Sequence, residues 1–300
     1  MVKSPREIRF ELACTPFDLD YTLTCGQAFR WERHEGWWHG VVRETFVKIR
    51  QIGGVLQFQT FSENVDDAFI WSYFRLDDDL PHIHSRIEKD RHIREAVKKF
   101  NGLRLMRQEP WECLISYICA TNTNIPVIKN MINNMCIHFG KRITVEGAEV
   151  YTFPKPNDLA KASLKELRLC KLGFRAERVK QTSNLISNGN LNLEALKKMS
   201  YEKAKKELLS LPGVGPKVAD CVLLFSLEKL EAFPIDVWMK RAILEFYGMH
   251  FEKSFIEKIS SEKSLSPSKY EIISSFGREY FGEHVGYAQE YLFHYKRCQQ

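Results

Sequence analysis

Several features that classify many proteins are absent from this 300-residue sequence. No run of about 18 apolar residues is present, so we expect no transmembrane helix. The opening residues, MVKSPREIRFEL, contain no apolar stretch of signal-peptide length, which predicts a protein that stays inside the cell. There is no repeat of fixed period and no low-complexity linker, so we expect the parts of the chain to pack closely together.

Metal-binding patterns are missing too. The cysteines form no CxxC pair and no cluster with histidine, and the closest histidine pair, His82 and His84, has no cysteine near it. This spacing argues against zinc and iron–sulfur sites, so no metal and no cofactor are predicted. In an intracellular chain we expect free thiols, most of them buried, at Cys14, Cys25, Cys113, Cys119, Cys136, Cys170, Cys221 and Cys298.

The composition is that of an ordered protein with a mildly basic charge. Hydrophobic residues make up 44% and aromatic residues 12% of the chain, which is enough for an ordered core. The net charge of +6 and the isoelectric point of about 8.8 suit a polyanionic partner without requiring one. We expect the protein to act as a monomer.

The pattern of apolar residues changes along the chain. Residues 1 to about 80 have strand character, most clearly at 47–59, where apolar and polar residues alternate on both sides of a Gly53-Gly54 turn. From about residue 88 the period is helical. The sequence therefore predicts an α+β protein, with a twisted antiparallel sheet domain and helices over 1–105 and an all-α domain over 106–300.

Helices are predicted from periodicity and from their end signals. Ser200 is a favoured capping residue at a helix start, and Gly189 stands where a helix ends. The predicted helices cover 87–100, 110–120, 127–140, 176–189, 200–210 and 236–248, with a long helical segment at the C-terminus.

The stretch LPGVGPKVADCVLLFS, residues 211–226, has the punctuation of a helix-hairpin-helix. Gly213 and Gly215 allow backbone conformations that other residues resist, and let the hairpin approach another surface closely. A second helix should start at Lys217, with free N–H groups that can bind phosphate whatever the base sequence. GVG alone fits an ordinary tight turn equally well, but the full pattern favours binding to a DNA backbone.

A lysine and an aspartate follow in positions that suit chemistry. Lysines near DNA most often bind phosphate, but the dipole at a helix start disfavours a cation at Lys217 and favours the neutral, nucleophilic amine. Asp236, in FPIDVWMKRAI, is a natural N-cap, and backbone N–H groups there favour its ionised form. Such a carboxylate can stabilise a positive sugar, and the two residues together are a stronger signal than either alone.

These segments resemble the helix-hairpin-helix DNA glycosylases, and within them the 8-oxoguanine DNA glycosylase/AP lyases of the eukaryotic-like type. The match spans roughly residues 20 to 295. Four further segments narrow the resemblance: CGQAFRW (25–31), ICATNTNI (118–125), LGFRAERV (172–179) and GYAQEYLF (286–293). The resemblance implies a sheet domain of the TATA-binding-protein type and a substrate of double-stranded DNA that contains 8-oxoguanine.

The resemblance also implies roles for single residues. Lys217 would attack the sugar and expel the base through a Schiff base, and Asp236 would stabilise the charged sugar. β-Elimination would then nick the strand. The remaining implied contacts concern the base and the duplex: the Gly26 carbonyl to N7–H, Gln289 to the Watson–Crick edge, Cys221 and Phe293 on the two base faces, Asn122 in the emptied stack, Phe174 as a wedge, Arg175 and Asn122 to the orphaned cytosine, and Gly213 and Gly215 to phosphate.

Some positions depart from the family pattern. Val127 stands where a second cytosine-reading arginine is usual, which predicts a weaker preference for the opposite base. Trp238 replaces a phosphate-contacting histidine, and its indole N–H could serve as the donor. Thr123 interrupts an asparagine run. The hairpin carbonyls, for instance those of Leu211 and Val214, are candidate ligands for a structural monovalent cation.

Other interpretations remain open at this point. Taken singly, Cys221, Phe174 and Phe293 fit ordinary packing, Asn122 fits a turn, and Arg175 fits the surface. An alkylpurine glycosylase of the same scaffold typically lacks the lysine. An endonuclease III-like enzyme carries a four-cysteine iron–sulfur cluster, whereas Cys298 is the only cysteine after Cys221 here. A non-catalytic DNA-binding module would need neither Lys217 with Asp236 nor a base pocket.

Overall fold

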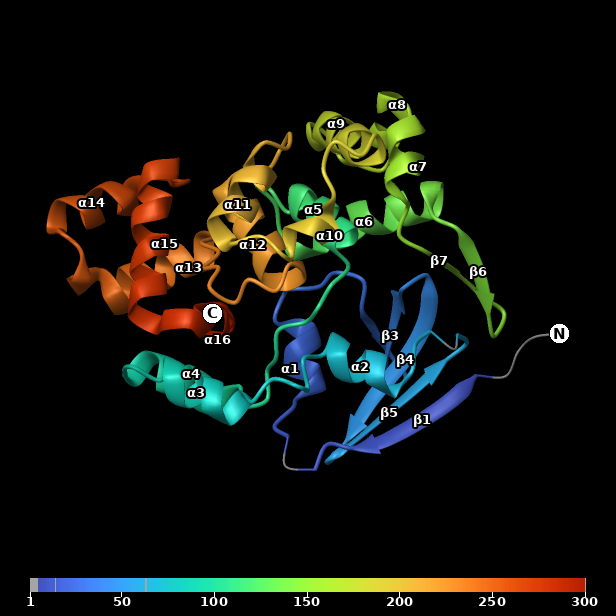
Figure 1. Cartoon of the computed structure of the whole chain (residues 1–300), viewed down its shortest axis with the longest axis horizontal. Coiled ribbons are helices and arrows are strands. Elements are labelled where there is room, and N and C mark those ends of the chain that lie inside the picture. The colour runs from blue at the N-terminus through green and yellow to red at the C-terminus, as the bar shows by residue number, and fades with distance from the viewer. Residues whose placement is uncertain (1–4, 14, 63, 300) are drawn as a thin grey trace.

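The computed structural model describes residues 5–299 except 14 and 63. Figure 1 shows a sheet at one end of the molecule and a larger group of helices at the other. This arrangement confirms the predicted α+β class. Cys14 lies outside the described residues; of the other cysteines, all but the exposed Cys298 are buried free thiols, as expected.

The sheet is antiparallel, with the strand order β1-β5-β4-β3-β2. Its central hairpin is the predicted one, because the turn at Gly53-Gly54 pairs Ile49 with Phe58 and Ile52 with Val55. In β3 and β5 buried residues alternate with partly exposed ones, so these strands bury one face, whereas the short edge strand β2 is exposed throughout. The strands are β1 (Arg6–Glu11), β2 (Glu32–His34), β3 (Trp37–Val42), β4 (Thr45–Ile52) and β5 (Val55–Thr60).

Two hydrophobic cores meet near residue 105. The first core joins the sheet to α1 (Leu19–Thr24) and α2 (Asp67–Tyr73). The second core contains the helices of the C-terminal part together with α3 (Leu80–Ile87) and α4 (Arg91–Lys99). Helices α3 and α4 therefore pack with the helical core, although they precede the predicted boundary at 105/106. The boundary itself stays a prediction.

The predicted helices are present with small shifts of their ends, apart from the one over 236–248. The second hairpin helix starts at Pro216, one residue before the predicted start at Lys217. Ser200 caps its helix, and Gly189 follows the end of another with a φ of +75°. The helices are α5 (Pro110–Cys119), α6 (Ile125–Phe139), α7 (Pro156–Lys161), α8 (Leu164–Leu169), α9 (Arg175–Ser187), α10 (Leu193–Leu196), α11 (Tyr201–Leu209), α12 (Pro216–Ser226), α13 (Val237–Ala242), α14 (Lys253–Ser261), α15 (Pro267–Phe281) and α16 (Val285–Arg297).

Two details of the prediction for 106–300 were wrong. The region is not all-α, because β6 (Arg142–Val145) and β7 (Ala148–Tyr151) form a hairpin around Glu146 and Gly147, whose φ angles are +51° and +83°. The predicted helix over 236–248 is also not uniform. After α13 the chain continues as a π-helical segment, Ile243–Tyr247, and then as a short 3₁₀ turn.

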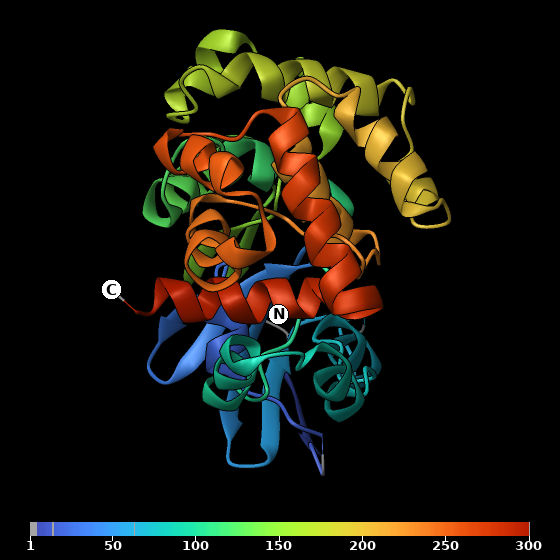
Figure 2. The same ribbon diagram turned by 90° about the vertical axis from the view of Figure 1, so that its left-hand side faces the viewer.

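Helix α16 joins the two parts of the molecule. Figure 2 shows it lying across the junction between the other helices and the sheet, and it packs against α3, α4, α13 and α15. The Tyr291 hydroxyl donates to the carbonyl of Leu103, and Arg297 donates to the carbonyl of Thr24. The end of the chain is thereby fixed next to the segment that contains Gly26. Within the described residues, no helix has the length and apolar character needed to cross a membrane.

Candidate active site at the hairpin

A cavity of about 890 Å³ lies where α12, α13 and α16 meet the segment around Gly26. Its walls come from residues that are far apart in the sequence. Most of the predicted site residues line it, namely Gly26, Asn122, Gly213, Gly215, Lys217, Cys221, Asp236, Trp238, Gln289 and Phe293. The fold therefore brings together the segments on which the resemblance was based.

The hairpin between α11 and α12 confirms one part of the glycine argument and corrects another. Gly213 has a φ of +83°, and a Cβ there would lie 2.8 Å from the side chain of Arg178. Gly215 has an ordinary φ of −97°, so the conformational argument for that residue was wrong. No atom within 4 Å would meet a Cβ on Gly215, which leaves the hairpin surface open there.

The N-terminus of α12 has the features of an anion site. Gly215 is the N-cap residue and has no side chain with which to satisfy the N–H groups of the first turn. The Thr182 hydroxyl donates to the Pro212 carbonyl at 2.9 Å and ties the hairpin to α9. A cation on the carbonyls of Leu211 and Val214 stays a prediction; the Leu211 carbonyl accepts the N–H of Val214.

Lys217 lies in the first turn of α12 and faces the cavity. Its Nζ is 4.9 Å from the centroid of the Tyr117 ring. Tyr117 is buried, its ring stacks on Phe225, and its hydroxyl donates to the Gln27 carbonyl at 3.2 Å. The ammonium or amine of Lys217 is thus held over a fixed aromatic face. Sequence reasoning missed Tyr117, since a tyrosine inside an apolar helix looks like core.

Asp236 caps α13 as predicted. Its Oδ1 accepts the N–H groups of Trp238 and Met239 at 2.9 and 2.8 Å. Burial raises the pKa of Asp236 above its usual value, while the two backbone N–H groups and the charge of Lys217 oppose the rise. The sequence argument counted the N–H groups, which lower the pKa as expected, but not the burial that opposes them.

Cys221 and Phe293 both line the cavity. Burial raises the pKa of the Cys221 thiol to about 12, against the lowering effect of Lys217. The sulfur is therefore an uncharged, polarisable surface at neutral pH rather than a thiolate. Cys221 follows Lys217 by one helical turn on the same face of α12.

Gly26 is fixed in a conformation that favours glycine. Its φ is +106°, and a Cβ there would lie 2.6 Å from Nη1 of Arg297. The next residue, Gln27, is buried and immobilised: its side chain donates to the carbonyls of Thr22 and Arg104 and accepts the N–H of Met106. The backbone around Gly26 is thus preorganised by a fully used glutamine.

Three neighbouring groups on α16 are buried with unused hydrogen-bonding capacity. Gln289 and Glu290 are 4% and 2% exposed, and both line the cavity with Arg297. Among the described residues, no partner is found for Oε1 of Gln289, Oε1 of Glu290 or Nη1 of Arg297. Burial raises the pKa of Glu290 to about 7. Sequence reasoning found Gln289 through the family pattern and missed the other two.

Phe174 and Arg175 are the predicted residues that lie outside the cavity lining. Phe174 is 54% exposed, and the guanidinium groups of Arg175 and Arg178 lie 4.3 and 5.0 Å from its ring centroid. Arg175 is buried, and its Nε donates to the Thr121 carbonyl at 3.1 Å. It thereby holds the loop of Asn122, whose φ is +51°. The alternative of a solvated surface arginine was therefore wrong.

Of the three departures from the family pattern, Thr123 and Trp238 line the cavity and Val127 does not. Val127 is 43% exposed at the start of α6, beyond the Asn124 cap. The Arg241 guanidinium lies 4.6 Å from the centroid of the Trp238 ring. A positive charge therefore accompanies Trp238. Within the described part of the chain, no cluster of three His, Cys, Asp or Glu residues could hold a metal ion.

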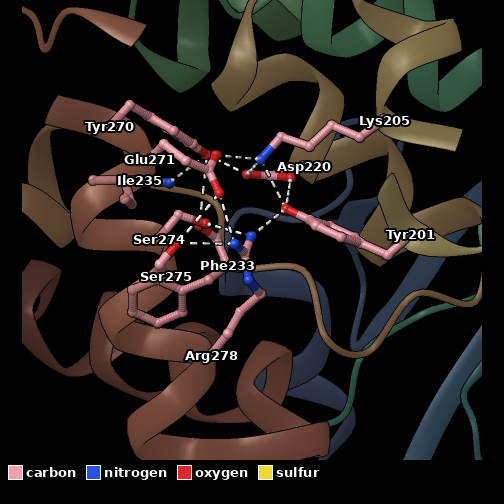
Figure 3. A network of polar contacts seen from close by, with 10 residues as sticks. All are labelled: Tyr201, Lys205, Asp220, Phe233, Ile235, Tyr270, Glu271, Ser274, Ser275 and Arg278. Carbon is pink, nitrogen blue, oxygen red and sulfur yellow. Dashed lines mark hydrogen bonds and ion pairs between the residues drawn. The ribbon is translucent and has the colours of Figure 1, made fainter. Parts of the chain in front are cut away.

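Behind the cavity, Asp220 anchors a buried polar network (Figure 3). Its carboxylate accepts the hydroxyls of Tyr201 and Tyr270 at 2.8 and 2.7 Å, and Lys205 donates to it at 3.2 Å. Tyr270 also accepts the N–H of Ile235 at 3.2 Å. The network therefore joins α11, α12 and α15 to the segment that carries Asp236.

Comparison with known proteins agrees with this geometry. Residues 9–114 match the model of the 8-oxoguanine DNA glycosylase N-terminal domain. Residues 115–264 match the HhH-GPD superfamily of base excision DNA repair proteins. The first model covers most of the sheet and α1–α4, and the second covers the hairpin, Lys217 and Asp236.

Relatives that match over most of their own length are named as glycosylases with lyase activity. The 8-oxoguanine glycosylase/lyase of Clostridium acetobutylicum, solved with double-stranded DNA containing cytosine opposite 8-oxoguanine, is 35% identical with a TM-score of 0.86, over 99% of this chain and 96% of that one. A probable N-glycosylase/DNA lyase of Methanothermobacter thermautotrophicus is 29% identical over 94% of both chains. The Arabidopsis thaliana N-glycosylase/DNA lyase OGG1 is 28% identical, over 97% of this chain and 80% of its own.

The fold and the site define a helix-hairpin-helix base excision repair protein. The chain belongs to the HhH-GPD superfamily and, within it, to the 8-oxoguanine DNA glycosylase/AP lyases. It is thus a bifunctional enzyme, with DNA glycosylase and AP lyase activities, as the sequence resemblance implied. The match of residues 9–114 to the 8-oxoguanine glycosylase N-terminal domain favours this family over the alkylpurine glycosylases and over a non-catalytic DNA-binding module.

Proposed function

We propose that the enzyme flips 8-oxoguanine out of duplex DNA into the 890 Å³ cavity and removes it through a Schiff base on Lys217. The observation that carries this proposal is the shared cavity of Lys217, Asp236 and the base-facing residues Cys221 and Phe293. A nucleophile beside a cavity large enough to hold a base is expected of an enzyme that acts on an extruded base.

The neutral amine of Lys217 would attack C1′ of the sugar as the bond from C1′ to the base breaks. The leaving base takes the bonding electron pair, and the proton that Nζ loses on bonding to C1′ passes to the base. Asp236, held at the start of α13, stabilises the positive charge that develops on the sugar. The ring then opens to an imine on Nζ. Loss of a proton from C2′ expels the 3′ oxygen, and this β-elimination nicks the strand.

Base recognition would use one hydrogen-bond acceptor in the cavity for which normal guanine has no donor. The Gly26 carbonyl accepts N7–H of 8-oxoguanine, whereas guanine offers a lone pair at N7. An unpaired buried acceptor costs roughly 1–3 kcal/mol, so this contact discriminates against guanine. Gln289 reads the Watson–Crick edge with a side-chain oxygen that is otherwise unsatisfied. Cys221 and Phe293 cover the two faces of the base.

The duplex would be held open by the loop and wedge beside the cavity. Asn122 fills the gap left by the base, and the exposed ring of Phe174 wedges against the stack. Arg175 fixes the Asn122 loop and, with it, contacts the orphaned cytosine. Gly213, Gly215 and the first turn of α12 bind phosphate, as do Trp238 and the adjacent Arg241. DNA in the crystal of the Clostridium relative supports this substrate class.

Borohydride trapping tests the proposal. A duplex with 8-oxoguanine opposite cytosine should give a covalent protein–DNA complex, and Lys217→Gln should abolish it. Lys203→Gln, an exposed lysine on the neighbouring helix α11, is the matched control and should trap normally. Trapping that persists in Lys217→Gln would exclude Lys217 as the nucleophile. Duplexes with each of the four opposite bases should show weak discrimination, since Val127 offers no hydrogen bond.

A further inference from the structure

Arg297 is a pocket residue that no family pattern assigned. It lies at the end of α16, lines the cavity, and is held beside Gly26 by a hydrogen bond from Nη2 to the Thr24 carbonyl. Its guanidinium carbon is 5.3 Å from the centroid of Phe293. The side chain is therefore anchored at one nitrogen and packed against a ring that faces the base.

The other terminal nitrogen, Nη1, has no hydrogen-bond partner among the described residues, although it is buried. Buried polar groups are nearly always paired, so an unpaired guanidinium N–H in a cavity points to a ligand. Glu290 carries a carboxylate on the same helix and also lines the cavity. No ion pair within 4 Å joins the two among the described residues, and Oε1 of Glu290 is itself unpaired.

The position of Nη1 indicates which atom of the base it would meet. A Cβ on Gly26 would lie 2.6 Å from it, so it stands directly beside the residue whose carbonyl is proposed to accept N7–H. In 8-oxoguanine the ring atom next to N7 is C8, which carries an exocyclic oxygen. The cavity wall thus offers the Arg297 Nη1 donor beside the Gly26 carbonyl acceptor. These two groups complement the O8 acceptor and the N7–H donor of the base. Guanine has a C8–H at this place and offers nothing to accept.

We infer that Arg297 is a specificity-determining residue that donates a hydrogen bond from Nη1 to the C8 oxygen of the extruded base. The inference rests on the proposed function and deepens it, because the pocket would then recognise both changes that oxidation makes at the imidazole ring. The N7–H is recognised by the Gly26 backbone, and the new oxygen by the Arg297 side chain. Lesions that keep a carbonyl oxygen next to an N–H at this edge are the expected substrate class.

The test compares binding of two lesions by two proteins. Duplexes carry 8-oxoguanine or 8-thioguanine, which keeps N7–H but replaces O8 with a poor acceptor, and a 2′-fluorine blocks cleavage. Wild type should bind the oxo duplex more tightly. Arg297→Met should weaken binding of the oxo duplex about tenfold or more, as expected for a charged donor, and change binding of the thio duplex by about twofold at most.

Two controls separate this inference from folding and from the proposed function. Arg91→Met removes the same charge from an exposed position on α4 and should leave both affinities unchanged. Thermal unfolding of Arg297→Met, compared with wild type, separates loss of a lesion contact from loss of folding. An unchanged oxo-to-thio ratio in Arg297→Met, or equal affinities in wild type, would overturn the role of Arg297. Failure of wild type to excise 8-oxoguanine would overturn the proposed function and this inference with it.

Discussion

Helix α12 separates two buried polar environments that begin at adjacent residues. Asp220 points to a cluster with α11 and α15 in which its carboxylate has three hydrogen-bond donors (Figure 3). Cys221 points to the cavity, where Gln289, Glu290 and Arg297 each keep an unpaired polar atom within the described part of the chain. A satisfied cluster stabilises the fold, whereas an unsatisfied one is available to a ligand. We therefore assign the Asp220 cluster to the scaffold of the enzyme and the cavity to its active site.

The largest effect on stability is expected on the satisfied side. Asp220→Ala leaves Lys205 and two tyrosine hydroxyls without their buried acceptor, so the free energy of unfolding should fall by about 3–5 kcal/mol. Urea denaturation at neutral pH measures this fall. Asp220→Asn keeps an acceptor and should lose less. A loss below about 1 kcal/mol in Asp220→Ala would show that the cluster does not stabilise the fold.

Asp236→Asn should produce the largest effect on chemistry with little effect on stability. Asparagine is as good an N-cap as aspartate, so the bonds from Trp238 and Met239 can persist. Loss of the charge should slow base excision by about 10²–10³-fold. Single-turnover excision of 8-oxoguanine and thermal unfolding are measured together. Equal rates for variant and wild type would remove Asp236 from the mechanism.

Glu290→Gln should change how stability depends on pH. The folded-state pKa of Glu290 is about 7, above the ordinary value of 4.5, so its stabilising contribution is present at low pH and is lost as pH rises through 7. Relative to wild type, the glutamine variant should therefore gain about 2–3 kcal/mol of unfolding free energy between pH 5 and pH 8. Denaturation curves at both pH values test this. A constant difference between the two proteins would contradict the raised pKa.

Gln289→Leu should show the smallest effect on folding among these changes. Its side-chain oxygen has no partner to lose within the described residues, so the free energy of unfolding should stay within about 1 kcal/mol of wild type. Binding of a non-cleavable 8-oxoguanine duplex should nevertheless weaken by about 1–3 kcal/mol. A large loss of stability with unchanged binding would assign Gln289 to the scaffold instead.

Much of the fold follows from local patterns in the sequence. The sheet hairpin at Gly53-Gly54 and the hairpin before Lys217 were predictable because their periodicity and turn residues are local signals. The β6–β7 hairpin was missed because Glu146-Gly147 joins only short strands inside a helical region. Gly215 was misinterpreted because a glycine signals freedom of the backbone without showing whether the fold uses it.

The candidate site was predictable only where the chemistry left a pattern. Lys217 and Asp236 stand at helix starts, which glycine, proline and N-cap residues mark in the sequence. Glu290 and Arg297 become pocket residues only because α16 crosses back to the Gly26 segment, a contact between ends of the chain. Asp220 did leave a signal, since a carboxylate inside the apolar run ADCVLL must be paired if the helix is buried.

The central claim is that the cavity face of α12 carries the chemistry and that its Asp220 face does not. Mass spectrometry of the borohydride-trapped complex tests this most directly, because it locates the lysine that carries the reduced sugar. The account predicts a single modified residue, Lys217. Modification of Lys205, which pairs with Asp220, or of Lys240 on α13 would contradict it.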